Sequence, residues 1–221
     1  MNLSQNHALI KPMTKTVSNY SDIADLKARI RACTVCAKSQ SPLPVTPNPI
    51  VRGTAQSKIR IISQAPGNLA HQSGEPFYDP SGARLREWLG VNSATFYNED
   101  NFAITPMGFC FPGYDKHGGD LPPRKECAPL WQDPLTAHLQ GVELTLLVGM
   151  YAMKAYLGRD AHRTLTETVR HWRDYGPNVM PLPHPSWRNN GWIKRHDWFG
   201  EALETLKRRV DDLVLRQDAE G

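Results

Sequence analysis

Residues 58–67 read KIRIISQAPG, a short apolar run followed by a turn that contains proline and glycine. This pattern predicts a buried β-strand, because short apolar segments bounded by turn residues are typical of strands inside a protein. Three more strands are expected along the chain. They are predicted at 101–105, at 143–149 (ELTLLVG) and at 179–183 (VMPLP).

Helical patterns precede, separate and follow these strands. An amphipathic helix with Ser21 as its N-cap is predicted over 21–33. Further helices are predicted at 83–90, from Arg124, at 150–158 and near 197–217. Strands that alternate with helices predict a parallel sheet covered on both faces. The expected fold class is therefore α/β, a three-layer αβα sandwich with a central, mostly parallel four-stranded sheet.

The composition is that of a globular protein, with 40% hydrophobic and 22% charged residues among 221. Residues 1–20 are polar and aperiodic, so we expect a flexible tail there and a single domain over 21–221. The net charge of +4 permits a polyanionic partner without requiring one. Neither a signal-peptide pattern nor a transmembrane stretch is found, so we expect a cytoplasmic monomer with no membrane partner.

The four cysteines of the chain form a close pair and two singles, Cys33, Cys36, Cys110 and Cys127. In a protein without signs of secretion a disulfide framework is not expected. Four thiolates around one centre suit a tetrahedral zinc ion or an iron–sulfur cluster, and the spacing alone slightly favours zinc. Buried cysteines with no shared role are the alternative.

Two loops follow strands at the edge of the sheet where ligands bind in such folds. The first, over 63–82, reads SQAPGNLAHQSGEPFYDPSG, and the second, over 183–195, reads PHPSWRNNGWIKR. Either loop alone could be an ordinary turn or a loop with a solvated histidine.

Taken together with the cysteines, these loops resemble the uracil-DNA glycosylase superfamily, in its [4Fe–4S]-containing branch best known from thermophiles. That branch has Gly-Glu-Ala-Pro-Gly and Thr-Gly-Arg-Pro-Phe segments. The corresponding segments of this chain are Ser-Gln-Ala-Pro-Gly at 63–67 and Ser-Gly-Glu-Pro-Phe at 73–77. Its His-Pro-Ala/Ser motif, followed by Arg-Asn and a Lys, matches 184–186, 188–189 and Lys194. The resemblance covers roughly 21–215 and implies a [4Fe–4S] cluster, rather than zinc, on the four cysteines.

The resemblance also implies roles for the two loops in removing a flipped base from DNA. His184 is expected to stabilise the departing base by a hydrogen bond. The flipped base would stack on Phe77. Backbone amides of the turn after the first strand would bind a base carbonyl; this turn comprises Gln64, Ala65, Pro66 and Gly67.

Two departures from the branch bear on the chemistry. The branch carries a glutamate where this chain has the neutral Gln64, so the usual water-directing carboxylate is missing. Asn68, His71 or Glu75 would have to take over its role. The expected catalytic residues are His184, Asn68 and Gln64. Before its third cysteine the branch has an asparagine that reads uracil, and this chain has Pro106, which offers neither an amide side chain nor an N–H.

On the DNA side, Trp187 would wedge into the duplex or replace the extruded base. Ser186, Arg188 and Lys194 would contact the backbone, with Arg195 beside them. The sequence thus predicts a DNA N-glycosylase that removes a modified or damaged pyrimidine, with a modified cytosine of phage DNA slightly favoured and an antiviral role implied. Alternatives are a uracil-DNA glycosylase of base-excision repair, a catalytically weak binder of altered or abasic DNA, or an iron–sulfur redox enzyme on a similar scaffold.

Overall fold

The computed structural model describes residues 20–38 and 43–215. The predicted tail lies outside the described residues except for Tyr20, whose ring packs 6.4 Å from that of Trp131. Residues 216–221, which were assigned to the end of the domain, also lie outside them.

Four parallel strands form the central sheet, in the order β2-β1-β3-β4. Every residue of these strands is buried, as expected for a parallel sheet whose two faces are both covered. The predicted α/β class and the four strands are confirmed. The strands are β1 (Ile59–Ile62), β2 (Phe102–Ile104), β3 (Leu144–Val148) and β4 (Val179–Leu182).

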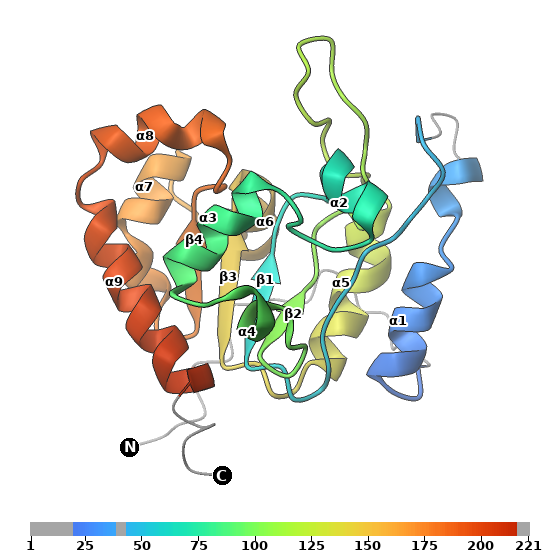
Figure 1. Cartoon of the computed structure of the whole chain (residues 1–221), viewed down its shortest axis with the longest axis horizontal. Helices are drawn as coiled ribbons and strands as arrows, with labels where there is room; N and C mark the ends of the chain where they lie inside the picture. The colour runs from blue at the N-terminus through green and yellow to red at the C-terminus, as the bar shows by residue number, and fades with distance from the viewer. Residues whose placement is uncertain (1–19, 39–42, 216–221) are drawn as a thin grey trace.

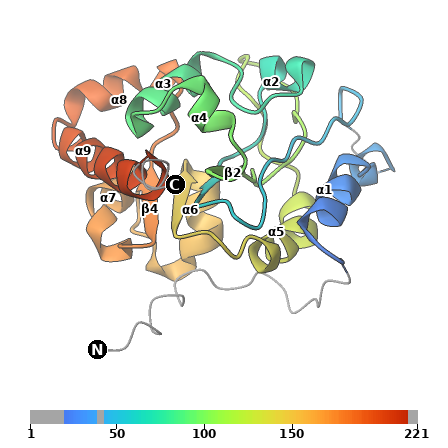
Figure 2. The ribbon, with the colours of Figure 1, turned by 60° about the horizontal axis from the view of Figure 1, so that its bottom comes forward.

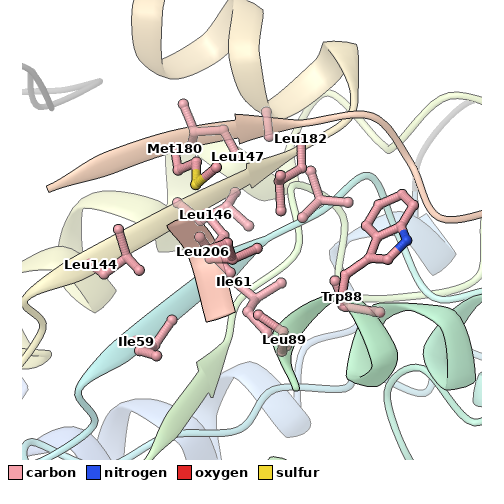
Figure 3. Packing of buried hydrophobic residues seen from close by; sticks show 14 of the residues in the cluster. Ile59, Ile61, Trp88, Leu89, Leu144, Leu146, Leu147, Met180, Leu182 and Leu206 are labelled. Atoms are coloured by element: carbon pink, nitrogen blue, oxygen red, sulfur yellow. The ribbon is translucent and has the colours of Figure 1, made fainter. Parts of the chain in front are cut away.

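Helices cover both faces of this sheet (Figures 1 and 2). Helices α3 (Pro80–Leu89) and α9 (Phe199–Val210) lie on one face, and α5 (Cys127–His138), α6 (Met150–Leu157) and α7 (Leu165–Arg170) lie on the other. Figure 3 labels Trp88 of α3, Leu206 of α9 and Ile61 of β1, which belong to the main core. The remaining helices are α1 (Ile23–Arg31), α2 (Asn68–Ser73), α4 (Ser93–Tyr97) and α8 (Asn190–Arg195).

Helix α1 begins one residue later than its predicted cap implies. The N-cap is Asp22, not Ser21, because the Asp22 carboxylate accepts hydrogen bonds from the backbone N–H groups of Ala24 and Asp25 at 2.8 and 2.9 Å. Both residue types are good caps, and an aspartate also interacts favourably with the helix dipole. None of the described helices has both the length and the apolar character needed to cross a membrane.

One strand residue carries a charge into the core. Arg60 of β1 is 2% exposed, and its guanidinium donates hydrogen bonds to Thr105 Oγ1 at 2.9 Å, Thr136 Oγ1 at 2.6 Å and Gln132 Oε1 at 2.8 Å. The amide of Gln132 donates in turn to the carbonyl oxygen of Pro106 at 2.7 Å. Burial lowers the pKa of the Arg60 guanidinium. This network joins the sheet, helix α5 and the turn that follows β2.

The segment between Phe77 and α3 is folded unusually tightly. Phe77 has a φ of 58°, the only positive value among non-glycine residues of the described ranges. A Cβ on Gly82 would lie 1.8 Å from the carbonyl oxygen of Phe77. The backbones can approach this closely only because residue 82 has no side chain.

We therefore predict that Gly82→Ala destabilises the protein by about 3 kcal/mol or more, because the clash is with backbone that cannot rotate away. Chemical denaturation followed by circular dichroism measures this change. Gly200→Ala is the matched control, since it also lies in the first turn of a helix and a Cβ there meets no atom within 4 Å. It should stabilise the protein by about 0.5–1 kcal/mol. Equal stability of the two variants would contradict the prediction.

Candidate active site

The loops that follow the strands meet at the carboxyl edge of the sheet, at the top of Figure 1. A pocket opens there between the turn after β1, the Phe77 segment, the turn after β2 and the loop after β4. Of the residues predicted to form the site, the structure brings together Ala65, Pro66, Gly67, Phe77, Pro106 and His184. A pocket at this edge is expected, because the carboxyl ends of parallel strands face the same way.

His184 is held in a defined tautomer. The backbone N–H of Ser186 donates to Nδ1 of the His184 ring at 3.3 Å, so Nδ1 carries no proton and a neutral ring carries its proton on Nε2. Burial lowers the pKa of His184, and the nearby Asp79 carboxylate opposes this effect. His184 therefore lines the pocket as a neutral hydrogen-bond donor.

Two side chains outside the predicted set fix the loop of His184. The side-chain amide of Asn189 donates to the carbonyl oxygen of His184 at 2.6 Å. Arg84 of α3 donates to the carbonyl oxygens of Pro185 and Ser186 at 3.2 and 3.1 Å. Arg84 belongs to a helix that is distant in sequence, so the motif around His184 gave no indication of this contact.

The apolar wall of the pocket includes the ring of Phe77. This ring is 9% exposed and packs edge-to-face on Phe96, with 6.2 Å between ring centroids. The hydroxyl of Tyr97 donates to the carbonyl oxygen of Pro76 at 3.1 Å, which ties the segment to α4. A base that entered the pocket would meet this aromatic surface.

The turn after β1 is hydrogen bonded to the turn after β2. The backbone N–H of Gly108 donates to the carbonyl oxygen of Gln64 at 2.9 Å, and the side chain of Gln64 donates to the carbonyl oxygen of Leu121 at 3.0 Å. Asn68 is the first residue of α2 and is half-buried. Neither Gln64 nor Asn68 is among the residues that line the pocket.

The other two alternatives in the first loop, Glu75 and His71, are also absent from the pocket lining. Glu75 Oε1 is 2.7 Å from the Nη1 atom of Arg52, in an ion pair. The ring of His71 lies 6.2 Å from that of Phe111.

Two carboxylates that sequence reasoning missed do line the pocket, Asp79 and Asp120. Their Oδ2 atoms each lie 3.8 Å from the position that a Cβ on Gly67 would occupy. Asp79 precedes a proline at a helix start, and this pattern could have identified it as an N-cap. No local pattern marks Asp120.

Asp120 lies on a hairpin over 113–121 that projects above the pocket edge in Figure 1. The N–H of Leu121 donates to the carbonyl oxygen of Gly113 at 2.9 Å, and the N–H of Asp115 donates to that of Gly119 at 2.7 Å. Desolvation raises the pKa of the Asp120 carboxyl, although the residue as a whole is exposed. Arg188 opposes this shift, and the carboxylates of Asp79 and Asp115 add to it.

The predicted DNA-contacting residues lie on the outer surface of the same edge. Trp187 is 71% exposed, and the guanidinium carbon of Arg188 lies 5.6 Å from the centroid of its ring. Arg188 also donates to the carbonyl oxygen of Gly118 in the hairpin at 3.0 Å. Ser186 Oγ accepts from the backbone N–H of Arg188 at 3.1 Å, and Lys194 is exposed in α8.

The four cysteines lie near one another beside α1 and α5. Cys36, Cys110 and Cys127 are each 6% exposed in one apolar cluster. Burial, together with the nearby thiols of Cys36, Cys110 and Cys33, raises the pKa of Cys127 to about 12. Within residues 20–38 and 43–215, no set of three or more His, Cys, Asp or Glu side chains is arranged to hold a metal ion.

The surroundings of these sulfurs nevertheless fit an iron–sulfur cluster in their chemistry. The backbone N–H of Asn48 donates to the sulfur of Cys110, and that of Phe109 donates to Cys127. Amide hydrogen bonds to thiolate sulfur and an apolar surrounding are features of such clusters. The remaining neighbours include Leu43 and Val51.

Comparison with protein families agrees with this architecture. The family model of the uracil DNA glycosylase superfamily matches residues 50–207. The matched region contains all four strands, both pocket loops and the hairpin between them. The chain therefore belongs to the uracil DNA glycosylase superfamily.

Proposed function

We propose that this protein is a DNA N-glycosylase that flips a modified pyrimidine out of the duplex and removes it by hydrolysis, leaving an abasic site. The observation that carries the proposal is the pocket in which a neutral His184 faces the same space as the ring of Phe77. Membership of the superfamily supports the reaction class.

The chemistry follows from these groups. Breaking the glycosidic bond places negative charge on the departing base and positive charge on the sugar. The Nε2–H of His184 would donate a hydrogen bond to the base as that charge develops, and the tautomer is set before the reaction by Ser186. Phe77 would hold the flipped base by stacking, with backbone amides of the turn after β1 as further donors.

The exposed surface beside the pocket supports a DNA partner. Trp187 is free to enter the duplex as a wedge because 71% of its surface is exposed. Arg188 and Lys194 would contact phosphates, and Ser186 would contact the DNA backbone beside them. That the protein acts as a monomer stays a prediction.

The choice of a modified pyrimidine rests on Pro106, which lines the pocket. Its carbonyl oxygen is occupied by the amide of Gln132 at 2.7 Å, and proline has no side-chain amide to pair with uracil. A larger base, such as a modified cytosine of phage DNA, is therefore favoured, and the protein would then serve in antiviral defence. Uracil repair or weak binding of altered DNA are the competing functions.

We predict that His184→Ala lowers single-turnover excision by about 10²-fold or more, because the departing base loses its hydrogen-bond donor. Release of abasic sites from duplexes bearing uracil, 5-hydroxymethylcytosine or its glucosylated form measures this rate. Binding to a duplex with an uncleavable 2′-fluoro nucleotide should stay unchanged. His171→Ala is the control, since His171 is exposed at the end of α7. Equal losses of binding and rate would make His184 a binding residue only.

Pro106→Asn should shift the preference towards uracil by roughly 10-fold, about 1–3 kcal/mol per restored base contact. The ratio of excision rates on uracil and 5-hydroxymethylcytosine duplexes gives the shift. Robust and selective uracil removal by the unaltered protein would argue for the repair function.

We also propose that Cys33, Cys36, Cys110 and Cys127 hold a [4Fe–4S] cluster. The cluster would brace the segments around it through four Fe–S bonds. Support comes from the shared apolar environment of Cys36, Cys110 and Cys127 and from the two N–H donors to sulfur.

Protein purified without oxygen should accordingly be brown and contain about four irons per chain. Cys127→Ala should lower both the iron content and the thermal stability, because metal binding and folding are coupled. Iron analysis and thermal unfolding measure the two effects. Colourless protein with one zinc ion per chain would contradict the assignment.

A further inference from the structure

We infer that Asp79 is the carboxylate that directs and deprotonates the attacking water, a role that no motif of the sequence assigns to it. The inference rests on the proposed glycosylase function. The pocket lining includes Asp79 and Asp120 but not Asn68, His71 or Glu75.

Asp79 is fixed in place by its position at the start of α3. Its Oδ1 atom accepts hydrogen bonds from the N–H of Gly82 at 2.8 Å and from the hydroxyl of Ser81 at 2.5 Å. Its Oδ2 atom lies 3.8 Å from the position of a Cβ on Gly67. The Oδ1 atom is thus hydrogen bonded at the start of α3, while the Oδ2 atom faces the pocket. This arrangement allows the carboxylate to position a water molecule.

The same segment fixes the aromatic wall. The tight approach between Gly82 and the carbonyl oxygen of Phe77 sets the distance between that ring and the Asp79 carboxylate. Asp79 is also near enough to His184 to oppose the effect of burial on the pKa of the ring. The base-stacking surface, the donor to the base and the carboxylate therefore line the same pocket.

Asp79 is better suited to this role than Asp120. Asp79 is half-buried and sits at a helix start, whereas Asp120 is exposed and belongs to the projecting hairpin. Desolvation and the nearby carboxylates raise the pKa of Asp120, and Arg188 faces it from the loop after β4. A base must be ionised and fixed in place. Asp79 meets the geometric requirement, whereas desolvation raises the pKa of Asp120 and so disfavours its ionised form.

The reaction is a hydrolysis of the glycosidic bond. The oxygen of water bonds to C1′ of the sugar, and the bond from C1′ to the base nitrogen breaks with its electron pair leaving on the base. Asp79 takes one proton of the water, and His184 hydrogen bonds to the base as its negative charge develops. The products are an abasic sugar that carries the hydroxyl at C1′ and the base anion, which takes up a proton as Asp79 releases its own to solvent and returns to the carboxylate.

The test is Asp79→Asn, which keeps a good N-cap and so preserves the start of α3. We expect single-turnover excision to fall by about 10²-fold or more, while binding to the 2′-fluoro duplex changes by less than about 2-fold. Asp79→Glu should restore part of the rate. Duplexes bearing uracil, 5-hydroxymethylcytosine or its glucosylated form are the substrates, and release of abasic sites is the measurement.

Glu75→Gln is the matched control, because it neutralises a carboxylate of the same loop that is paired with Arg52 outside the pocket lining. Asp120→Asn should reduce the rate less than Asp79→Asn does. Excision that survives Asp79→Asn, or that falls more with Asp120→Asn, overturns the assignment and leaves the glycosylase function standing. No abasic product from the unaltered protein on any of these duplexes overturns both.

Discussion

The buried guanidinium of Arg60 is the constraint on which the site depends. Removing a charge from water is costly unless its hydrogen bonds are satisfied, and here hydroxyl and amide oxygens of Thr105, Thr136 and Gln132 satisfy them. Tyr156 of α6 donates to the same Gln132 oxygen at 2.7 Å. Because these partners come from the end of β2 and from two helices, the network fixes the sheet, one helical layer and the pocket wall together.

This hydrogen-bond network also connects the pocket with the four cysteines. Gln132 lies in α5, which begins at Cys127, and it binds the carbonyl oxygen of Pro106 in the pocket wall. Cys110 follows Pro106 closely in sequence, so the segment between β2 and α5 serves both places. A cluster bound at the cysteines would therefore stabilise the pocket by holding both ends of this segment, including the hairpin that carries Asp120.

Much of the fold and part of the site could be predicted from local patterns. The four strands were found because their residues are mostly apolar, which is typical of strands buried on both sides of a parallel sheet. The pocket positions of Phe77 and His184 followed from motifs whose residues are adjacent in the chain. The cap of α1 was misplaced by one residue because Ser21 and Asp22 are both capable caps, and only the hydrogen bonds distinguish them.

The sequence by itself determined the α/β class, the edge of the sheet that carries the site and the family of the chain, because these depend on short runs of residues and their order. Only the tertiary structure decided which charged groups face the pocket. Asp79 and Asp120 lie on separate loops, and their carboxylates approach Gly67 only after the hairpin and α3 have packed at the sheet edge. The burial of Arg60 was decided in the same way, since its hydrogen-bond partners are brought together by packing and not by sequence neighbours.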